Sequence, residues 1–140
     1  MILLDTNVVS EPLKLNADPT VIAWIDAQVI ETLYLSTVSV TEMRYGIAVL
    51  PDGKKKESLR TSLDERILPL FESRILPFDM EAAEICAELR ARVKALGQGI
   101  GTADSYIAAI AGAKGLTVAT RHTQPFEAAG VSVINPWKAA

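Results

Sequence analysis

Short, almost continuously apolar runs alternate along this chain with longer segments of helical periodicity. Such runs are typical of parallel strands covered on both faces, whereas half-exposed antiparallel strands alternate between apolar and polar residues. Strands that alternate with helices form right-handed crossovers and a doubly wound sheet. We therefore predict an α/β fold, an α/β/α sandwich around a central parallel sheet of about five strands, at residues 1–4, 32–35, 74–78, 116–120 and 131–134.

Residues that favour helix ends divide the rest of the chain into helices. Asp and Thr side chains accept hydrogen bonds from the free N–H groups of a first turn, proline fits within that turn, and glycine follows a last turn. A proline further inside a helix breaks or kinks it. The predicted helices run from Asp18 and Pro19 to about Gln28, from Ser39 or nearby to Leu50, from Lys54 to a break or kink at Pro69, from Asp79 to Gly97, and from the cap Thr102 to Gly115.

The length and composition fit one compact domain, residues 1–140, with a single core. Apolar residues make up 49% of the chain, and Cys86, the only cysteine, cannot form an internal disulfide. We expect a packed thiol in a cytoplasmic protein. The acidic fifth residue argues against a secretory signal. The lack of a long apolar run argues against a membrane span. With a net charge of −3, any nucleic-acid affinity must come from local basic patches or a bound metal.

Three acidic residues are the candidates for chemistry. Asp5 ends the first predicted strand, Glu42 lies early in the helix after the second, and Asp104 lies in the first turn of the helix before the fourth. Each also has an ordinary explanation. Asp5 fits a helix N-cap, and Glu42 fits a capping box with Ser39. Asp104 fits an acid in a first turn, where it interacts favourably with the positive end of the helix dipole. Small apolar residues on the face of Asp104 predict that its carboxylate is mostly buried.

A divalent cation would account for all three acids together. Ligands of a doubly wound sheet bind beyond the carboxyl ends of its strands, and clustered carboxylates there favour a hard cation. One histidine and one cysteine cannot form a zinc cage, so Mg²⁺ fits best, with Mn²⁺ possible. Such ions typically serve phosphodiester hydrolysis. We expect Asp5, Glu42 and Asp104 to be the catalytic metal ligands, and Thr6, Asn7 or Thr120 to hold waters or phosphate oxygens.

Sequence blocks spread over nearly the whole chain carry a family resemblance. The acids lie in residues 3–11, 39–42 and 102–104, and further blocks are residues 74–79, 116–121 and 134–137. In this order and spacing the chain resembles the PIN-domain ribonuclease toxins of VapBC-type toxin–antitoxin modules, particularly their FitB-like branch. The resemblance implies a PIN-type sandwich and a metal-dependent endoribonuclease that arrests translation.

The resemblance also implies partners. A cognate VapB- or FitA-like antitoxin would neutralise the chain, and the toxin would form a homodimer within a toxin–antitoxin hetero-oligomer. Operator DNA would be bound only through the antitoxin. The RNA target stays open among transfer, ribosomal and messenger RNA, because recognition depends on groove shape.

His122 departs from the family pattern, since relatives often carry Asp or Asn after Thr-Arg. A neutral imidazole can fill that site, bridge to metal through water, or face solvent. We expect Arg121 and His122 to contact RNA or the antitoxin, with an ion pair between Arg121 and an acid such as Glu127 as the alternative. Some relatives place an acid where this chain has Pro125, so we predict no fourth carboxylate.

Other functions stay open at this point. A housekeeping PIN nuclease of RNA processing would use the same metal chemistry, and an antitoxin reading frame upstream would argue against it. A catalytically weak PIN interaction module, with His122 marking a degraded site, would not cleave RNA when metal is added. A phosphoryl-accepting receiver or a haloacid-type phosphatase is the least favoured class, because Asp5-Thr6-Asn7 lacks the second nearby acid of the phosphatase pattern.

Overall fold

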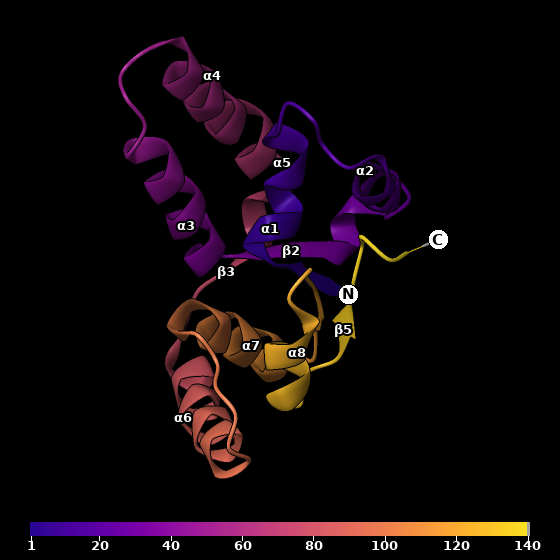
Figure 1. Cartoon of the computed structure of the whole chain (residues 1–140), viewed down its shortest axis with the longest axis vertical. Helices are drawn as coiled ribbons and strands as arrows, with labels where there is room; N and C mark the ends of the chain where they lie inside the picture. Colours follow the sequence, from indigo (N-terminus) through magenta and orange to yellow (C-terminus); the bar gives the residue numbers. More distant parts are fainter. Residues whose placement is uncertain (140) are drawn as a thin grey trace.

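A computed structural model describes residues 1–139, and Ala140, the last residue of the predicted domain, lies outside the described residues. Five strands form one sheet in the order β3-β2-β1-β4-β5, and every neighbouring pair is parallel. Helices cover both faces of the sheet (Figure 1), which confirms the predicted α/β/α sandwich. The strands overlap the predicted ones: β1 (Ile2–Leu4), β2 (Leu33–Ser36), β3 (Ile75–Leu76), β4 (Thr117–Ala119) and β5 (Val133–Ile134).

The winding direction of the chain reverses between β1 and β4. From β1 the chain moves outward through β2 to β3, and it later returns to the other side of β1 to form β4 and β5. Leu4 pairs with Ala119, and the N–H of Asp5 donates to the carbonyl oxygen of Ala119 at 2.9 Å. Asp5 and Thr120 are therefore neighbours just beyond the carboxyl ends of these strands, where doubly wound sheets bind ligands.

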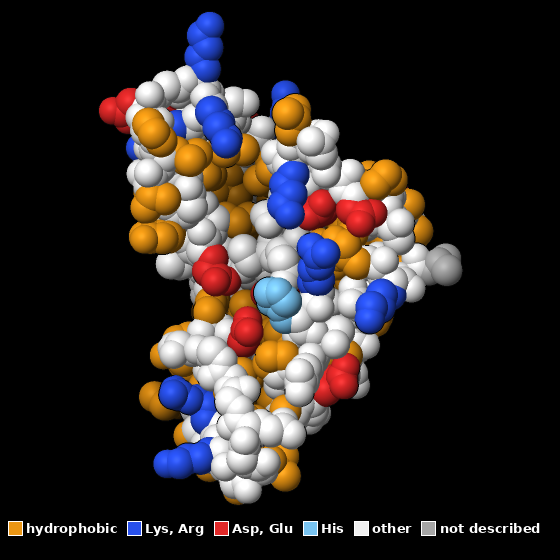
Figure 2. All heavy atoms as spheres, viewed as in Figure 1, with side chains coloured by type: hydrophobic (Ala, Val, Ile, Leu, Met, Phe, Trp, Pro, Cys, Tyr) orange, Lys and Arg blue, Asp and Glu red, His pale blue; other side chains and the backbone are white. Residues whose placement is uncertain are grey.

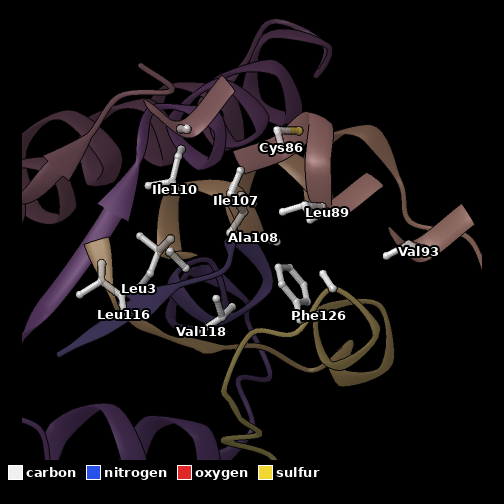
Figure 3. Packing of buried hydrophobic residues seen from close by; sticks show 14 residues of the cluster. Leu3, Cys86, Leu89, Val93, Ile107, Ala108, Ile110, Leu116, Val118 and Phe126 are labelled. Carbon is white, nitrogen blue, oxygen red and sulfur yellow. The ribbon is translucent and has the colours of Figure 1, made fainter. Parts of the chain in front are cut away.

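One apolar core lies on the face of the sheet that includes Leu3. It is covered by α6 (Met80–Ala95), α7 (Thr102–Lys114) and α8 (Thr123–Ala128). Buried alanines of α7 let this helix pack closely. Figure 3 shows the Phe126 ring of α8 among the side chains of this core, and that ring is fully buried.

A second core lies on the opposite face, because consecutive residues of a strand point to opposite sides, so the prediction of a single core is wrong. This second core includes Leu4 and is covered by α1 (Thr6–Val9), α3 (Thr37–Ala48), α4 (Lys54–Ser62) and α5 (Leu68–Phe71). In Figure 1 these helices lie across the sheet from α6 and α7. The strands are thus covered on both faces, as their apolar character predicts.

Most helix starts follow the predicted caps. Asp18 caps α2 (Pro19–Asp26) and Asp79 caps α6, each accepting a hydrogen bond from a first-turn N–H. The prediction that Thr102 caps α7 is wrong. The chain enters helical geometry one residue earlier, so Gly101 occupies the cap position and its carbonyl oxygen accepts the N–H of Ser105.

The third predicted helix is interrupted near Pro69, as predicted. After α4 the chain forms a wider turn, η3 (Leu63–Ile67), in which the N–H of Leu68 donates to Leu63 five residues back. The following helix α5 has Pro69 in its first turn, where an N–H would have no helical acceptor. No helix within residues 1–139 has the length and apolar character needed to cross a membrane. Shorter helical turns are η1 (Glu11–Leu13), η2 (Ile30–Thr32) and η4 (Glu72–Arg74).

Candidate active site

Asp5 is a buried carboxylate held between the ends of two strands. Its side chain is only 4% exposed, directly after β1. Oδ1 accepts the N–H of Thr6 at 2.8 Å, so Asp5 does cap α1. Oδ2 accepts the hydroxyl of Thr120 at 2.8 Å and the amide of Asn7 at 3.4 Å. Capping therefore explains only one of the two oxygens, and the other is fixed by the residue after β4.

Glu42 is connected to the same edge through Thr6. The Thr6 hydroxyl donates to Oε1 of Glu42 at 2.6 Å, and the hydroxyls of Thr6 and Ser39 are hydrogen-bonded at 2.9 Å. The cap of α3 is Ser36, whose hydroxyl accepts the N–H of Ser39. Glu42 is therefore not the glutamate of a capping box begun by Ser39, and that ordinary explanation is wrong.

Asp104 lies at the start of α7, beside the other two acids. Its side chain is only half-buried, so the prediction of a mostly buried carboxylate is wrong. The reason is its place in the first turn, which extends beyond the packed part of the helix. Partial burial raises the pKa of Asp104, the charge of Glu42 raises it further, and His122 opposes the shift.

Burial also dominates the electrostatics of Asp5. Loss of hydration raises the pKa of Asp5 above its ordinary value of 3.8, although hydrogen bonds from Thr120 and Thr6 oppose the rise. The negative charge of Asp104 raises the pKa of Asp5 further, and His122 lowers it. The charge of Asp104 therefore acts on Asp5, and the charge of Glu42 acts on Asp104, although the three acids come from distant parts of the sequence.

The three acids have the right chemistry for metal ligands, but their side chains are spread apart. Within residues 1–139, no three Asp, Glu, His or Cys side chains lie close enough to ligate one ion together. Burial raises the pKa values of Asp5 and Asp104, and neighbouring carboxylates raise them further, so negative charge at this edge is unfavourable. A divalent cation, held directly or through water, would offset that cost, because carboxylate oxygens are the ligands it prefers.

The remaining predicted site residues lie on the loop after β4. The N–H of His122 donates to the hydroxyl oxygen of Thr120 at 3.0 Å, and the N–H of Arg121 donates to Oδ1 of Asn7 at 3.4 Å. The side chains of Arg121 and His122 are exposed. Figure 2 shows the pale blue histidine side chain next to red carboxylates and blue cationic groups on one face.

The sequence did not reveal three further residues around this edge. Ser39 is fully buried and links α3 to Thr6. Glu11 is buried and accepts the N–H of Asp18, which, with the ion pair to Lys14, lowers the pKa of Glu11. Trp137 contacts Arg121 from the C-terminal segment. Ser36-x-x-Ser39 has the spacing of a helix cap and a third residue, and Glu11 and Trp137 lie in the sequence blocks that carry the family resemblance, but no pattern predicted their place at this edge.

A largely apolar groove leads away from the carboxylate edge. It has a volume of about 820 Å³ and lies between α1, η1, α3 and α4. Figure 2 shows hydrophobic side chains in the hollow above the acidic groups. Because Thr6 and Glu42 line one end, the groove and the candidate active site are continuous. Other lining residues include Leu13, Met43, Ile47 and Leu59.

Known proteins share both the sequence and the fold. Residues 2–131 match the family model described as PIN domain. The chain is 53% identical to "VapC ribonuclease Y4jK" of Sinorhizobium fredii over 100% of both chains. It is 53% identical to "Toxin FitB" of Neisseria gonorrhoeae over 98% of this chain and 99% of that protein.

A solved structure agrees over the whole length. The structure titled "Structure of FitAB bound to IR36 DNA fragment" contains a chain with a TM-score of 0.97 and 51% identity, covering 100% of this chain and 98% of that one. The family match and this solved structure agree with the fold described above. The chain belongs to the PIN domain family.

Proposed function

We propose that this chain is a metal-dependent endoribonuclease and the toxin of a type II toxin–antitoxin module. The observation that carries the proposal is the connected set of side chains at the reversal of the sheet. Thr120 binds Asp5, Thr6 binds Glu42, the charge of Asp104 raises the pKa of Asp5, and the charge of Glu42 raises the pKa of Asp104. Carboxylates brought together at this place serve a cation and an anionic ligand better than they serve stability.

The named relatives support the substrate and the partner. A VapC ribonuclease and a FitB toxin are both 53% identical to this chain over nearly their whole lengths, and a FitAB complex has been solved with DNA. The corresponding assignments here are RNA phosphodiester hydrolysis and neutralisation by a cognate VapB- or FitA-like antitoxin. Operator DNA would be bound through that antitoxin. These relatives favour a toxin over a housekeeping nuclease.

The assigned cation is Mg²⁺, with Mn²⁺ as the substitute, and its ligands are Asp5, Asp104 and Glu42. When bound, such an ion activates water and stabilises charge on phosphoryl oxygens. Thr120 and Thr6 donate hydrogen bonds to two of the carboxylates. We assign these hydroxyls to orienting the ligands, because each proton is already donated to an acid. Asn7 steadies Asp5 in the same way.

We further propose that the cytoplasmic toxin is a homodimer within the antitoxin complex. The outer side of α3 supports a contact surface, because Tyr45 is 69% exposed and Val49 is 60% exposed. Both residues lie next to each other on one helix face, four positions apart. Sedimentation of the purified chain, with and without the antitoxin, measures the two stoichiometries directly.

Cleavage by the isolated chain tests the catalytic assignment. Protein freed of antitoxin is incubated with structured RNA in EDTA, Mg²⁺ or Mn²⁺, and the cleaved ends are mapped. We expect cleavage only with a divalent ion, and none from Asp5→Asn or Asp104→Asn. Asp52→Asn is the matched control, because Asp52 is fully exposed in the turn after α3 and should leave cleavage unchanged.

Expression in cells tests the biological role. We expect growth arrest from the wild-type chain, rescue by the reading frame upstream, and no arrest from Asp5→Asn. Metal-independent cleavage, or arrest that survives both Asp5→Asn and Asp104→Asn, contradicts the assigned chemistry. Cleavage without any arrest would instead favour a housekeeping nuclease.

A further inference from the structure

We propose that the guanidinium of Arg121 binds an RNA phosphate beside the carboxylate edge, and that Trp137 holds the guanidinium in position. The proposal rests on the ribonuclease function proposed above and names residues that would seat its substrate. Arg121 would be a binding residue in contact with RNA. Trp137 would be a positioning residue that acts only through Arg121.

The backbone of Arg121 is fixed to the active edge. The residue before it, Thr120, binds Asp5 through its side chain and pairs with Ile134 through its N–H at 2.9 Å. The N–H of Arg121 itself donates to the side chain of Asn7. Arg121 therefore starts from the same strand end as the proposed metal ligands, and its position depends on the same hydrogen bonds.

Trp137 lies under the guanidinium because a tight turn returns the chain after β5. Oδ1 of Asn135 accepts the N–H of Trp137 at 3.0 Å, and the carbonyl oxygen of Asn135 accepts the N–H of Lys138. The indole packs against the core on the α1 and α3 side of the sheet. The central carbon of the Arg121 guanidinium is 5.2 Å from the centre of the ring, a cation–π distance.

The guanidinium is otherwise free to bind an anion. Within residues 1–139 its nitrogen atoms form no ion pair, so the alternative of an ion pair with Glu127 or another acid is not found. The side chain is exposed. The N–H donors of a guanidinium lie in its own plane, so a guanidinium held over an aromatic ring can still bind two phosphate oxygens. The charge of the buried Glu11 is favourable to Arg121 without contacting it.

Because the edge is acidic, RNA binding there requires a local cation such as Arg121. The chain has a net charge of −3 and three acids at the site, so it offers a polyanion no general attraction. Two other cations are already paired: Lys14 with Glu11, and Arg44 with Asp64. Arg121 combines an unpaired charge, a fixed orientation and a backbone tied to the carboxylate edge.

RNA binding by variants of Arg121 and of Trp137 tests both residues. A short, labelled single-stranded RNA of mixed sequence is titrated against metal-free protein, and the same RNA is then used for cleavage with Mn²⁺. We expect Arg121→Gln to weaken binding on the order of tenfold, to lower the salt dependence by about one phosphate contact, and to raise KM with kcat unchanged. Lys138→Gln, one residue from Trp137 and exposed, is the control that should leave all values unchanged.

The role of Trp137 needs a readout that a purely structural residue would not give. We expect Trp137→Leu to weaken RNA binding by roughly threefold, with Trp137→Phe recovering most of it, because a phenyl ring still attracts the cation. In the double variant Arg121→Gln and Trp137→Leu, the loss should equal that of Arg121→Gln alone. Thermal unfolding of each variant separates this effect from loss of fold, and Trp137→Phe provides the comparison if Trp137→Leu is unstable.

Several results would overturn the proposal. If the wild type cleaves RNA but Arg121→Gln binds and cleaves it equally well, Arg121 does not seat the substrate. If Arg121→Gln weakens only the antitoxin complex, the contact belongs to the protein partner. Additive losses in the double variant would remove Trp137 from the proposal. A wild type that cleaves no RNA with either ion contradicts the proposed function instead, and the binding titration still decides the role of Arg121.

Discussion

The hydroxyl of Thr120 donates a 2.8 Å hydrogen bond to Oδ2 of Asp5, and both side chains are buried. The two residues are 115 positions apart and meet because β4 returns beside β1. This bond lowers the pKa of a carboxyl group that burial raises. Thr120 thus supports the charged form of Asp5, the form that binds a cation.

Removing that hydroxyl should weaken both the fold and the site. Thr120→Val leaves a buried acceptor without its donor, and we expect a loss of about 1.5–3 kcal/mol in unfolding free energy. The pKa of Asp5 should rise further, so the acid limb of the cleavage rate should move to higher pH. Thr120→Ser keeps the donor and should retain most of both properties. Denaturant unfolding and a pH–rate profile measure the effects, and an unshifted acid limb for Thr120→Val would count against the coupling.

A divalent ion should stabilise the folded chain through the three acids. At a concentration one hundred times its Kd, an ion that binds only the native state adds about 2.7 kcal/mol. We expect Mg²⁺ or Mn²⁺ to raise the unfolding temperature of the wild type and of Asp52→Asn, and to do so much less for Asp104→Asn. The effect should grow with pH, because ions compete with protons for carboxylates. Equal stabilisation of all variants would place the ion elsewhere.

Without metal, a lower pH should relieve the cost of holding buried, mutually repelling charges at the site. Asp5 and Asp104 have folded-state pKa values above the ordinary 3.8, so their ionised forms destabilise the native state at pH values above the folded pKa. That cost disappears as the pH falls through the folded pKa toward the unfolded one. In EDTA at neutral pH, Asp104→Asn should therefore unfold at a higher temperature than the wild type, and the difference should vanish at pH values below 3.8. If Asp104→Asn is less stable than the wild type at neutral pH, the charge of Asp104 stabilises the fold and the prediction is wrong.

Glu42 should contribute to cleavage far more than to stability. Its side chain is exposed and receives a 2.6 Å hydrogen bond from Thr6. We expect Glu42→Gln to change unfolding free energy by less than about 0.5–1 kcal/mol, as for other exposed polar sites, and to lower kcat at least tenfold. Steady-state cleavage and urea unfolding of the same preparation make the comparison. If Glu42→Gln loses much stability but keeps its kcat, Glu42 has a structural role and not a catalytic one.

Gly115 should be sensitive to any side chain. It ends α7 with a φ of +66°, in the left-handed region where glycine avoids the penalty of a Cβ atom. No atom within 4 Å would obstruct the new methyl group, so backbone strain alone should destabilise Gly115→Ala, by about 1 kcal/mol. Gly46→Ala is the control, because Gly46 lies inside α3 with equally open space and should become slightly more stable. Thermal unfolding compares the two, and a neutral Gly115→Ala would contradict the strain argument.

The sequence by itself determined the kinds of elements and their order. Apolar runs covered on both faces gave parallel strands, and local capping chemistry correctly located Asp18, Asp79 and Gly115 at helix ends. These features depend on neighbours a few residues away, so they are legible without the fold. The same locality explains an error: at the start of α7, one residue of backbone geometry moved the cap from Thr102 to Gly101.

The tertiary structure alone decided what each acid touches. The sequence left Asp5 balanced between a helix cap and a metal ligand, and only the return of β4 beside β1 gave its second oxygen a partner in Thr120. Likewise, Thr6 reaches Glu42 across 36 positions, and Trp137 meets Arg121 across the end of the sheet. Side-chain contacts of this kind depend on strand order and on degrees of burial, which arise from the packing of the whole chain and leave no local pattern in the sequence.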